Sequence, residues 1–377
     1  MTAPAPPVSA SLADPAARSG STVAWSDPQR AHAFDRWLQR IAPSHRLLPE
    51  TVRLASADAS FRRYLRIDTD GQPGNRIVMD APPDKENSAP FVQVAELLRD
   101  AGVTAPQVLE WERDDGFLLL DDLGTQTLLD VIDPERPEAN RPRYEQAIDA
   151  LIRWQLASKP GVLPPYDAAL LHRELSLFPD WYLARHRGIA VEGKLKETLD
   201  KTFALIVDTN LASASVYVHR DFMPRNLMIH SVATPGGGSA EQLAVLDFQD
   251  AVYGPITYDI ASLMRDAFLS WDESFVIDIT VRYWEAARRA KLPVDADFGE
   301  FYRAVEWMGL QRHLKVAGIF ARLTLRDGKP RYLADAPRFI HYIRATASRY
   351  RELKPLLQLI DQVEGTQAAV AWAFGRV

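Results

Sequence analysis

The side chains best suited to chemistry are gathered in residues 217–226 of this 377-residue chain, which read Tyr-Val-His-Arg-Asp-Phe-Met-Pro-Arg-Asn. Asp221 and Asn226 lie close together there, and a further acid, Asp247, follows the apolar run 243–246. A carboxylate can accept the proton of an attacking hydroxyl, and Asp and Asn oxygens suit Mg²⁺. Phosphoryl transfer needs mainly an aligned nucleophile and metal ions on the phosphates. We therefore predict Asp221 as catalytic base and Asn226 and Asp247 as magnesium ligands of an ATP-dependent kinase.

The alternative is that these residues only terminate strands or form turns, which is the usual role of an isolated Asp or Asn. Apolar strands expected at 216–218 and 243–246 would instead hold them on rigid backbone. We expect His219 to bond to nearby backbone rather than act as a base. Arg220 and Arg225 fit either a phosphate contact or a solvated loop.

The first third of the chain has the pattern of a sheet with one helix packed on it. Short β-prone segments are separated by turn residues such as Asp70-Gly71, and two amphipathic segments have helical spacing. Their order predicts an α+β arrangement. The expected strands are 50–55, 63–67, 76–79, 107–111 and 116–120, and the expected helices are 29–41 and 90–100.

The remainder is expected to be mainly helical. We predict three parts: an Ala/Pro/Ser-rich disordered extension at 1–24, a nucleotide-binding lobe at 25–120, and a catalytic and substrate-binding lobe at 121–377. The Pro- and Arg-rich stretch 134–142 is expected as a surface loop. The glycine-rich run 235–238 is expected to close a hairpin.

Composition excludes several classes. The net charge is −6 without a long Lys/Arg run, so nothing indicates a nucleic-acid-binding surface. There is no cysteine, which excludes disulfides and thiolate metal sites. No apolar stretch approaches the ~20 residues of a membrane helix, and the N-terminus lacks the pattern of a secretory signal. We expect a cytoplasmic protein without a membrane or obligate protein partner.

The motifs resemble the aminoglycoside phosphotransferase and choline kinase superfamily. Within it, the segments HRDFMPRN, LDFQDAVYGPITYDIASLMRD and GLQRHLKVAGIFARL are similar to the anomeric amino-sugar kinases of cell-wall recycling. The resemblance covers residues 30–370. It implies a bilobal protein-kinase-like fold, with a small lobe of antiparallel sheet plus helix and a larger, mainly helical lobe. It also implies ATP and Mg²⁺ as cofactors, and phosphorylation of N-acetylmuramate or N-acetylglucosamine at the C1 hydroxyl.

The nucleotide side departs from the family pattern. Most relatives carry a lysine on the third strand that holds phosphates and pairs with a helical glutamate, whereas Met79 or Asp80 stands there. Arg62, Arg63 and Lys85 are candidates to replace it. The remaining candidates are Ser60 in the glycine-free first loop, Glu96 as the paired glutamate, and Asp121 and Leu123 in the segment that resembles the adenine-binding hinge.

Substrate contacts are expected from the helical part. Glu174 lies in ELSLFPDW, which resembles the amino-sugar kinases, although apolar residues there also suit a core. The lactyl carboxylate of N-acetylmuramate calls for an arginine fork, for which Arg312 is the first candidate and Arg265 the second. Alternatively, Arg312 pairs with a carboxylate such as Glu306, and Arg265 with Asp259 or Asp266.

Two other functions stay open. One is a kinase of another small alcohol, such as an aminoglycoside, choline or homoserine. The other is a non-catalytic, nucleotide-binding pseudokinase, which the missing lysine on the third strand would favour.

Overall fold

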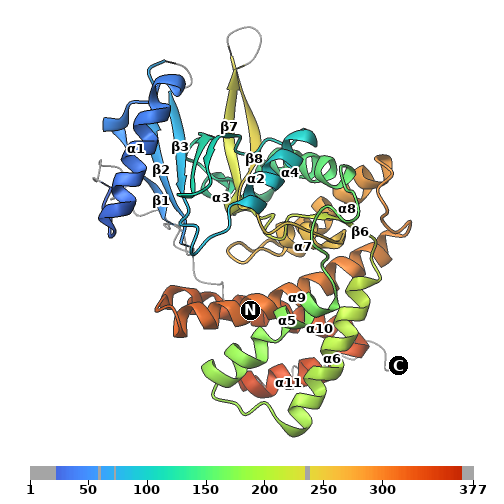
Figure 1. The fold of residues 1–377 in the computed structure, drawn as a ribbon. Helices are drawn as coiled ribbons and strands as arrows, with labels where there is room; N and C mark the ends of the chain where they lie inside the picture. The colour runs from blue at the N-terminus through green and yellow to red at the C-terminus, as the bar shows by residue number, and fades with distance from the viewer. Residues whose placement is uncertain (1–22, 58–60, 72–73, 234–237, 367–377) are drawn as a thin grey trace, which may run out of the picture. The chain divides into compact units, whose positions relative to one another are not determined.

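The computed structural model describes residues 23–57, 61–71, 74–233 and 238–366, which form two compact units (Figure 1). The first contains the described residues up to Ala95 together with Pro106–Leu123, and the second contains Glu96–Ala105 and the described residues from Gly124 onward. The predicted division of nucleotide binding and catalysis between 25–120 and 121–377 stays a prediction. Among the helices in the described ranges, none has the length and apolarity needed to cross a membrane.

The first unit is built on an antiparallel sheet of five strands in the order β1-β2-β3-β5-β4. The predicted sequence of three strands, a helix and two strands is confirmed, and with it the α+β class. The elements are α1 (Pro28–His45), η2 (Pro49–Thr51), β1 (Arg53–Ala57), β2 (Arg63–Asp68), β3 (Asn75–Asp80), α2 (Ala89–Asp100), β4 (Val108–Glu112) and β5 (Phe117–Asp121). Helix α2 is divided between the units, because its residues from Glu96 onward belong to the second.

Helix α1 is capped at its N-terminus and packs on the sheet. The Asp27 side chain accepts a hydrogen bond from the Gln29 N–H at 2.8 Å, which caps the helix N-terminus. The apolar face then packs on the sheet, where the rings of Phe34 and Trp37 lie 5.5 and 5.4 Å from that of Phe117. This aromatic contact anchors α1 to β5.

The second unit is mainly helical, with two small antiparallel strand pairs, β6 with β9 and β7 with β8. Its elements are α3 (Leu128–Val131), α4 (Pro137–Leu156), α5 (Ala168–Leu175), the π-helical η3 (Phe178–His186), α6 (Gly193–Leu211), β6 (Ser215–Val218), η4 (Pro224–Asn226), β7 (Leu227–Ala233), β8 (Ser239–Val245), β9 (Val252–Pro255), α7 (Thr257–Met264), α8 (Glu273–Arg289), α9 (Phe298–Leu325), η5 (Pro330–Asp335), α10 (Ala336–Arg349), η6 (Arg351–Leu353) and α11 (Lys354–Glu364).

The expectations for this unit were partly wrong. The stretch 134–142 is not wholly a loop, because α4 begins at Pro137, where the fixed φ of proline suits a first helical turn. Strand β9, the partner of β6, was not predicted. The hairpin of β7 and β8 is confirmed by their pairing, while residues 234–237 of its turn lie outside the described ranges.

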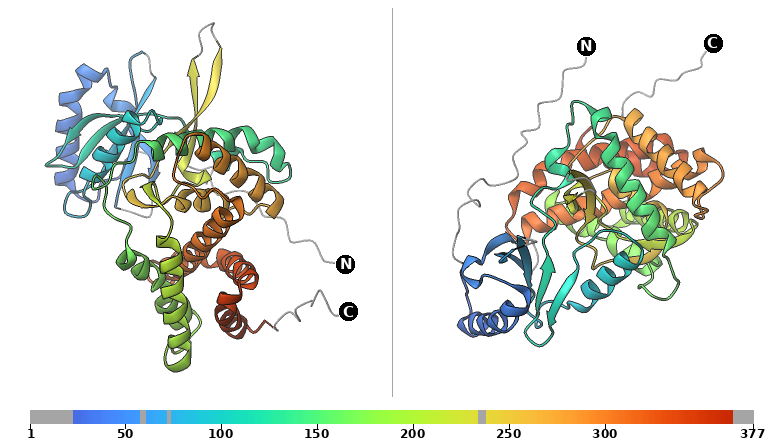
Figure 2. Two further views of the ribbon diagram at one scale, coloured as in Figure 1. Left: turned by 90° about the vertical axis from the view of Figure 1, so that its right-hand side faces the viewer. Right: turned by 90° about the horizontal axis from the view of Figure 1, so that it is seen from above.

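Helix α9 is the central packing element of the second unit (Figure 2). It contacts α6, α7, α10 and η3. Gly318 permits a close approach to the residue before η3, because a Cβ there would lie 2.3 Å from the carbonyl carbon of Leu177. Side chains of α9 contact Glu174 near the end of α5 and Arg220 in the loop after β6.

Candidate active site

The loop after β6 is held by the buried carboxylate of Asp259 at the start of α7. The backbone N–H groups of His219 and Arg220 donate to its two oxygens at 2.7 and 3.0 Å. Burial raises the pKa of Asp259 to about 7, although the two N–H groups act to lower it. Arg220 has φ +77°, a conformation that non-glycine residues adopt only where the surroundings enforce it. The loop that carries Asp221 is thus fixed by its neighbours.

His219 has the structural role that we expected. Its Nδ1 accepts a hydrogen bond from the Asp221 N–H at 3.2 Å, and its Nε2 lies 3.0 Å from the Leu246 carbonyl oxygen. These partners require a neutral ring with the proton on Nε2. Burial lowers the pKa of His219 to about 4, which keeps the ring neutral at physiological pH. The imidazole joins the Asp221 loop to the strand end before Asp247.

The structure brings the three predicted catalytic residues together. The Asn226 side-chain amide donates to the Asp221 carbonyl at 2.9 Å and to a carboxylate oxygen of Asp247 at 3.4 Å. Gln249 donates to the other carboxylate oxygen of Asp247 at 2.8 Å. Asp247 has φ +62°, which Asp tolerates better than most residues. The partly exposed Asp221 carboxylate receives no hydrogen bond from the protein within the described ranges, while both sides of its backbone are bonded.

The side-chain oxygens of Asn226 and Asp247 fit a magnesium ion that is shared with a nucleotide. Among the described residues, no group of three or more His, Asp or Glu side chains could hold a metal. Magnesium is commonly bound by one or two protein oxygens, with phosphates and water completing its shell. Asn226 and Asp247 provide such a pair.

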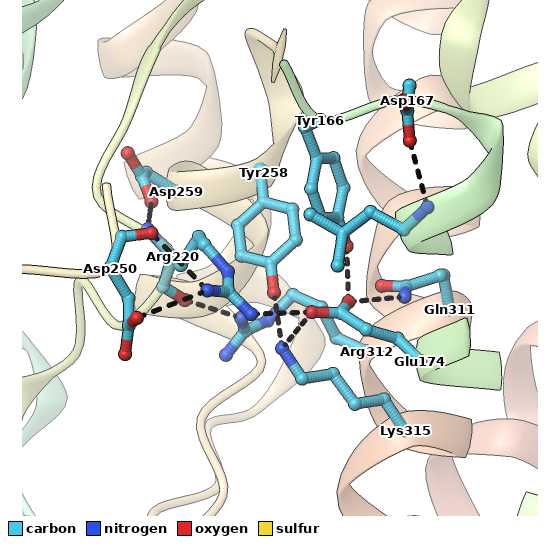
Figure 3. A network of polar contacts seen from close by, with 11 residues as sticks. Tyr166, Asp167, Glu174, Arg220, Asp250, Tyr258, Asp259, Gln311, Arg312 and Lys315 are labelled. Atoms are coloured by element: carbon cyan, nitrogen blue, oxygen red, sulfur yellow. Dashed lines mark hydrogen bonds and ion pairs between the residues drawn. The ribbon is translucent and has the colours of Figure 1, made fainter. Parts of the chain in front are cut away.

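Glu174 is at the centre of a buried polar network (Figure 3). Its Oε1 accepts from Arg220 at 2.7 Å and from Lys315 at 2.8 Å, and its Oε2 accepts from Tyr166 and Gln311. Burial acts to raise the pKa of Glu174, but Lys315 and Arg220 outweigh it and lower the value to about 2. Both oxygens are engaged by the protein, which favours a positioning role over the predicted substrate contact.

The two candidate arginines for the substrate carboxylate lie in different surroundings. Arg312 is 3% exposed, donates to the Arg220 carbonyl oxygen at 2.8 Å and lies over the Tyr258 ring. Glu306 is not its partner, because Glu306 bonds to Arg349 and Tyr350.

Arg265 bonds to Glu273 at 2.9 Å and to Tyr302 at 3.1 Å, not to Asp259 or Asp266. It lines a cavity of about 300 Å³, whose walls also include Trp271, His341, Tyr342 and Thr346. The residues that line this cavity do not include Asp221, Asn226 or Asp247.

Two of the nucleotide-side candidates, Arg62 and Arg63, belong to separate ion pairs in the first unit. Arg63 donates to the buried carboxylate of Asp80 at 2.9 Å, and Arg30 donates to the same carboxylate at 2.8 Å. Arg62 instead pairs with Glu86 at 3.1 Å. A cation–carboxylate pair is therefore present near the first loop, but it involves Glu86 rather than the predicted Glu96, which is exposed on α2.

The other nucleotide-side candidates are placed as follows. Lys85 lies over the ring of Phe61, with Nζ 5.2 Å from its centroid. Asp121 ends β5 and accepts from the Gln107 N–H at 2.6 Å, and Leu123 is buried. Ser60 lies outside the described residues.

Lys315, Asp80 and Glu86 were not predicted from the sequence as partners of the candidate site residues. Lys315 had a usable signal, because it follows Arg312 by three positions on a helix and so shares its face. Arg63 and Asp80 are opposite each other in the register of β2 and β3, which the strand predictions alone could not fix.

Comparisons with known proteins show the family to which the chain belongs. The phosphotransferase enzyme family matches residues 51–293. An N-acetylmuramate/N-acetylglucosamine kinase of Pseudomonas aeruginosa is 46% identical over 91% of this chain and all of its own length. A kinase of the same name from Neisseria meningitidis is also 46% identical, over 90% of this chain and 97% of its own.

Solved structures share the fold at low sequence identity. Plasmodium vivax ethanolamine kinase has a TM-score of 0.56 at 9% identity, covering 84% of this chain and 90% of its own. Choline kinase from Cryptosporidium parvum has a TM-score of 0.55 at 11% identity, covering 89% and 99%. The kinase-like fold expected from the resemblance is therefore confirmed.

Proposed function

The chain belongs to the phosphotransferase enzyme family, and from this premise we propose that it transfers the γ-phosphoryl group of ATP to the C1 hydroxyl of N-acetylmuramate and N-acetylglucosamine. The observation that carries a catalytic role is the Asn226 amide, which bonds to both the Asp221 backbone and the Asp247 carboxylate. The choice of sugar rests on the names of relatives that are 46% identical over nine-tenths of the chain. We place the reaction in the cytoplasm.

In the proposed reaction, Asp221 orients the C1 hydroxyl and accepts its proton as the oxygen bonds to the γ-phosphorus. The bond from that phosphorus to the β,γ-bridging oxygen breaks, and ADP leaves. Asn226 and Asp247 would hold magnesium, which neutralises charge on the phosphates when bound. The rigid backbone around Asp221 keeps its carboxylate aligned with the hydroxyl. This alignment matters, since misplacement by about 1 Å can lower the rate a hundredfold.

The proposal is tested by measuring ATP consumption against a panel of acceptors. Both amino sugars should stimulate ADP formation, whereas choline, homoserine and an aminoglycoside should leave it at the background rate. Stimulation by one of those alcohols alone would identify the alternative kinase. Nucleotide binding without turnover on any acceptor would identify a pseudokinase.

We propose Arg62, paired with Glu86, as the cation that replaces the missing lysine, and a structural role for Arg63. Arg62→Ala should raise the ATP KM or lower kcat about tenfold or more, with an unchanged melting temperature. Arg63→Ala should leave nucleotide kinetics within about threefold but lower stability by about 1–3 kcal/mol, because Asp80 loses one of its two cations. Steady-state kinetics and thermal melting measure both, and the reverse pattern would assign the phosphate role to Arg63.

We propose Arg265 as the partner of the lactyl carboxylate, since it lines a cavity whereas Arg312 is buried against the catalytic loop. Arg265→Ala should lower kcat/KM for N-acetylmuramate ten- to hundredfold and leave N-acetylglucosamine within about threefold, because charge-assisted hydrogen bonds contribute ~1.5–3 kcal/mol. Arg312→Ala should lower kcat for both sugars alike. Kinetics on both sugars with both variants decide the matter, and a selective loss in Arg312→Ala would return the carboxylate to Arg312.

A further inference from the structure

We propose that Lys315 is a positioning residue that, through Glu174, holds Arg220 and the adjacent Asp221 in their catalytic conformation. This inference rests on the proposed function, in which Asp221 is the catalytic base. Its structural part concerns only how the loop after β6 is held. Lys315 was not among the predicted site residues.

The first observation is the way in which three elements hold Arg220 (Figure 3). Its N–H donates to Asp259 on α7, its side chain donates to Glu174 on α5, and its carbonyl accepts from Arg312 on α9. Its φ of +77° is strained for a residue other than glycine and persists only where such contacts enforce it. The Arg220 side chain also donates to the Asp250 carbonyl oxygen at 3.3 Å. Removing one of these four contacts should allow the residue to relax.

The second observation is the way in which Lys315 holds Glu174. The Lys315 ammonium donates to Glu174 Oε1 at 2.8 Å, the same oxygen that accepts from Arg220, and also to the Tyr258 hydroxyl at 3.2 Å. Lys315 is bonded neither to Arg220 nor to Asp221 in the described structure, so it acts through the shared carboxylate. It ties the end of α5 to the long helix α9.

The third observation is the charge balance of this buried cluster. Glu174 is 5% exposed and Lys315 is 8% exposed, so neither charge is well solvated. The pKa of Glu174 is lowered to about 2 despite its burial, because Lys315 and Arg220 lie beside it. Without Lys315, the carboxylate would keep a single cation, Arg220, and only the neutral hydrogen bond from Gln311 would join it to α9. We infer that it would then move together with Arg220.

The experiment compares Lys315→Met, which removes the charge at similar length, with Lys315→Arg, which keeps it. A matched control is Arg344→Met, which breaks the ion pair with Asp361 between α10 and α11. Lys315→Met should lower kcat about tenfold or more and leave KM for ATP and for the sugar within about threefold. Lys315→Arg should recover at least part of this loss, and Arg344→Met should keep wild-type kcat.

Hydrogen–deuterium exchange provides a readout that needs no turnover. The amides of His219 and Arg220 donate to Asp259 on α7, and the amide of Asp221 donates to the His219 ring. Peptides from residues 216–227 should therefore exchange faster in Lys315→Met than in the wild type. They should be unchanged in Arg344→Met. If the wild type phosphorylates neither sugar, the proposed function fails while this measurement still decides the role of Lys315.

Three results would overturn the inference. The first is unchanged exchange of the loop in Lys315→Met. The second is a raised sugar KM with intact kcat, which would make Lys315 a direct substrate contact. The third is an equal loss of activity in Lys315→Met and Arg344→Met, which would indicate general destabilisation only.

Discussion

Asp221→Asn should lower kcat by about two or more orders of magnitude while nucleotide affinity stays within about threefold of the wild type. The amide has the size of the carboxylate but cannot accept the proton of the attacking hydroxyl. The bonds that fix this segment use the Asp221 backbone N–H and carbonyl, so the substitution leaves them in place. Steady-state kinetics and titration calorimetry with a nucleotide measure the two quantities.

A suitable control is Asp208→Asn, which makes the same chemical change at an exposed position on α6. It should retain turnover within about twofold. Near-normal turnover of Asp221→Asn, under conditions in which both proteins are folded, would remove Asp221 from the role of base.

Asp247→Ala should abolish magnesium-dependent nucleotide binding, because a carboxylate that we assign to the metal is lost. Since Asp247 has φ +62°, alanine there also introduces backbone strain. Asp247→Asn separates the two effects, because Asn tolerates this conformation and lacks only the charge. Both variants should lose the affinity that magnesium adds.

Calorimetry with Mg-ATP, and with ATP in the presence of a chelator, measures this difference for each protein. With the chelator present, the wild type and Asp247→Asn should bind ATP equally weakly. An unchanged Mg-ATP affinity in Asp247→Asn would contradict the assignment of Asp247 as a metal ligand.

The sequence was informative where residues lie near one another along the chain. Asp221 and Asn226 share one short segment, and Asp247 follows a strand whose apolar pattern is plain, so their proximity was predictable. The strands of the first unit and helices α1 and α2 followed from periodicity and turn residues in the same way. Local patterns of this kind need no knowledge of the tertiary structure.

Long-range pairing was not predictable. Glu174 and Lys315 are 141 positions apart, and no local pattern joins them. Arg63 looked available for phosphates until the register of β2 and β3 placed it opposite Asp80. Arg265 likewise pairs with Glu273, on the next helix, rather than with Asp259 or Asp266. Ion pairs between distant elements depend on packing, which a single sequence does not specify.

The central claim, phosphorylation of an amino sugar at C1, is tested most directly by phosphorus NMR of the product formed from N-acetylmuramate and ATP. We predict one new phosphomonoester signal, coupled to the anomeric proton of the sugar, that appears together with ADP. The signal should be absent with Asp221→Asn over the same interval. A phosphate coupled to protons at another carbon, or ADP formation without any sugar phosphate, would contradict it.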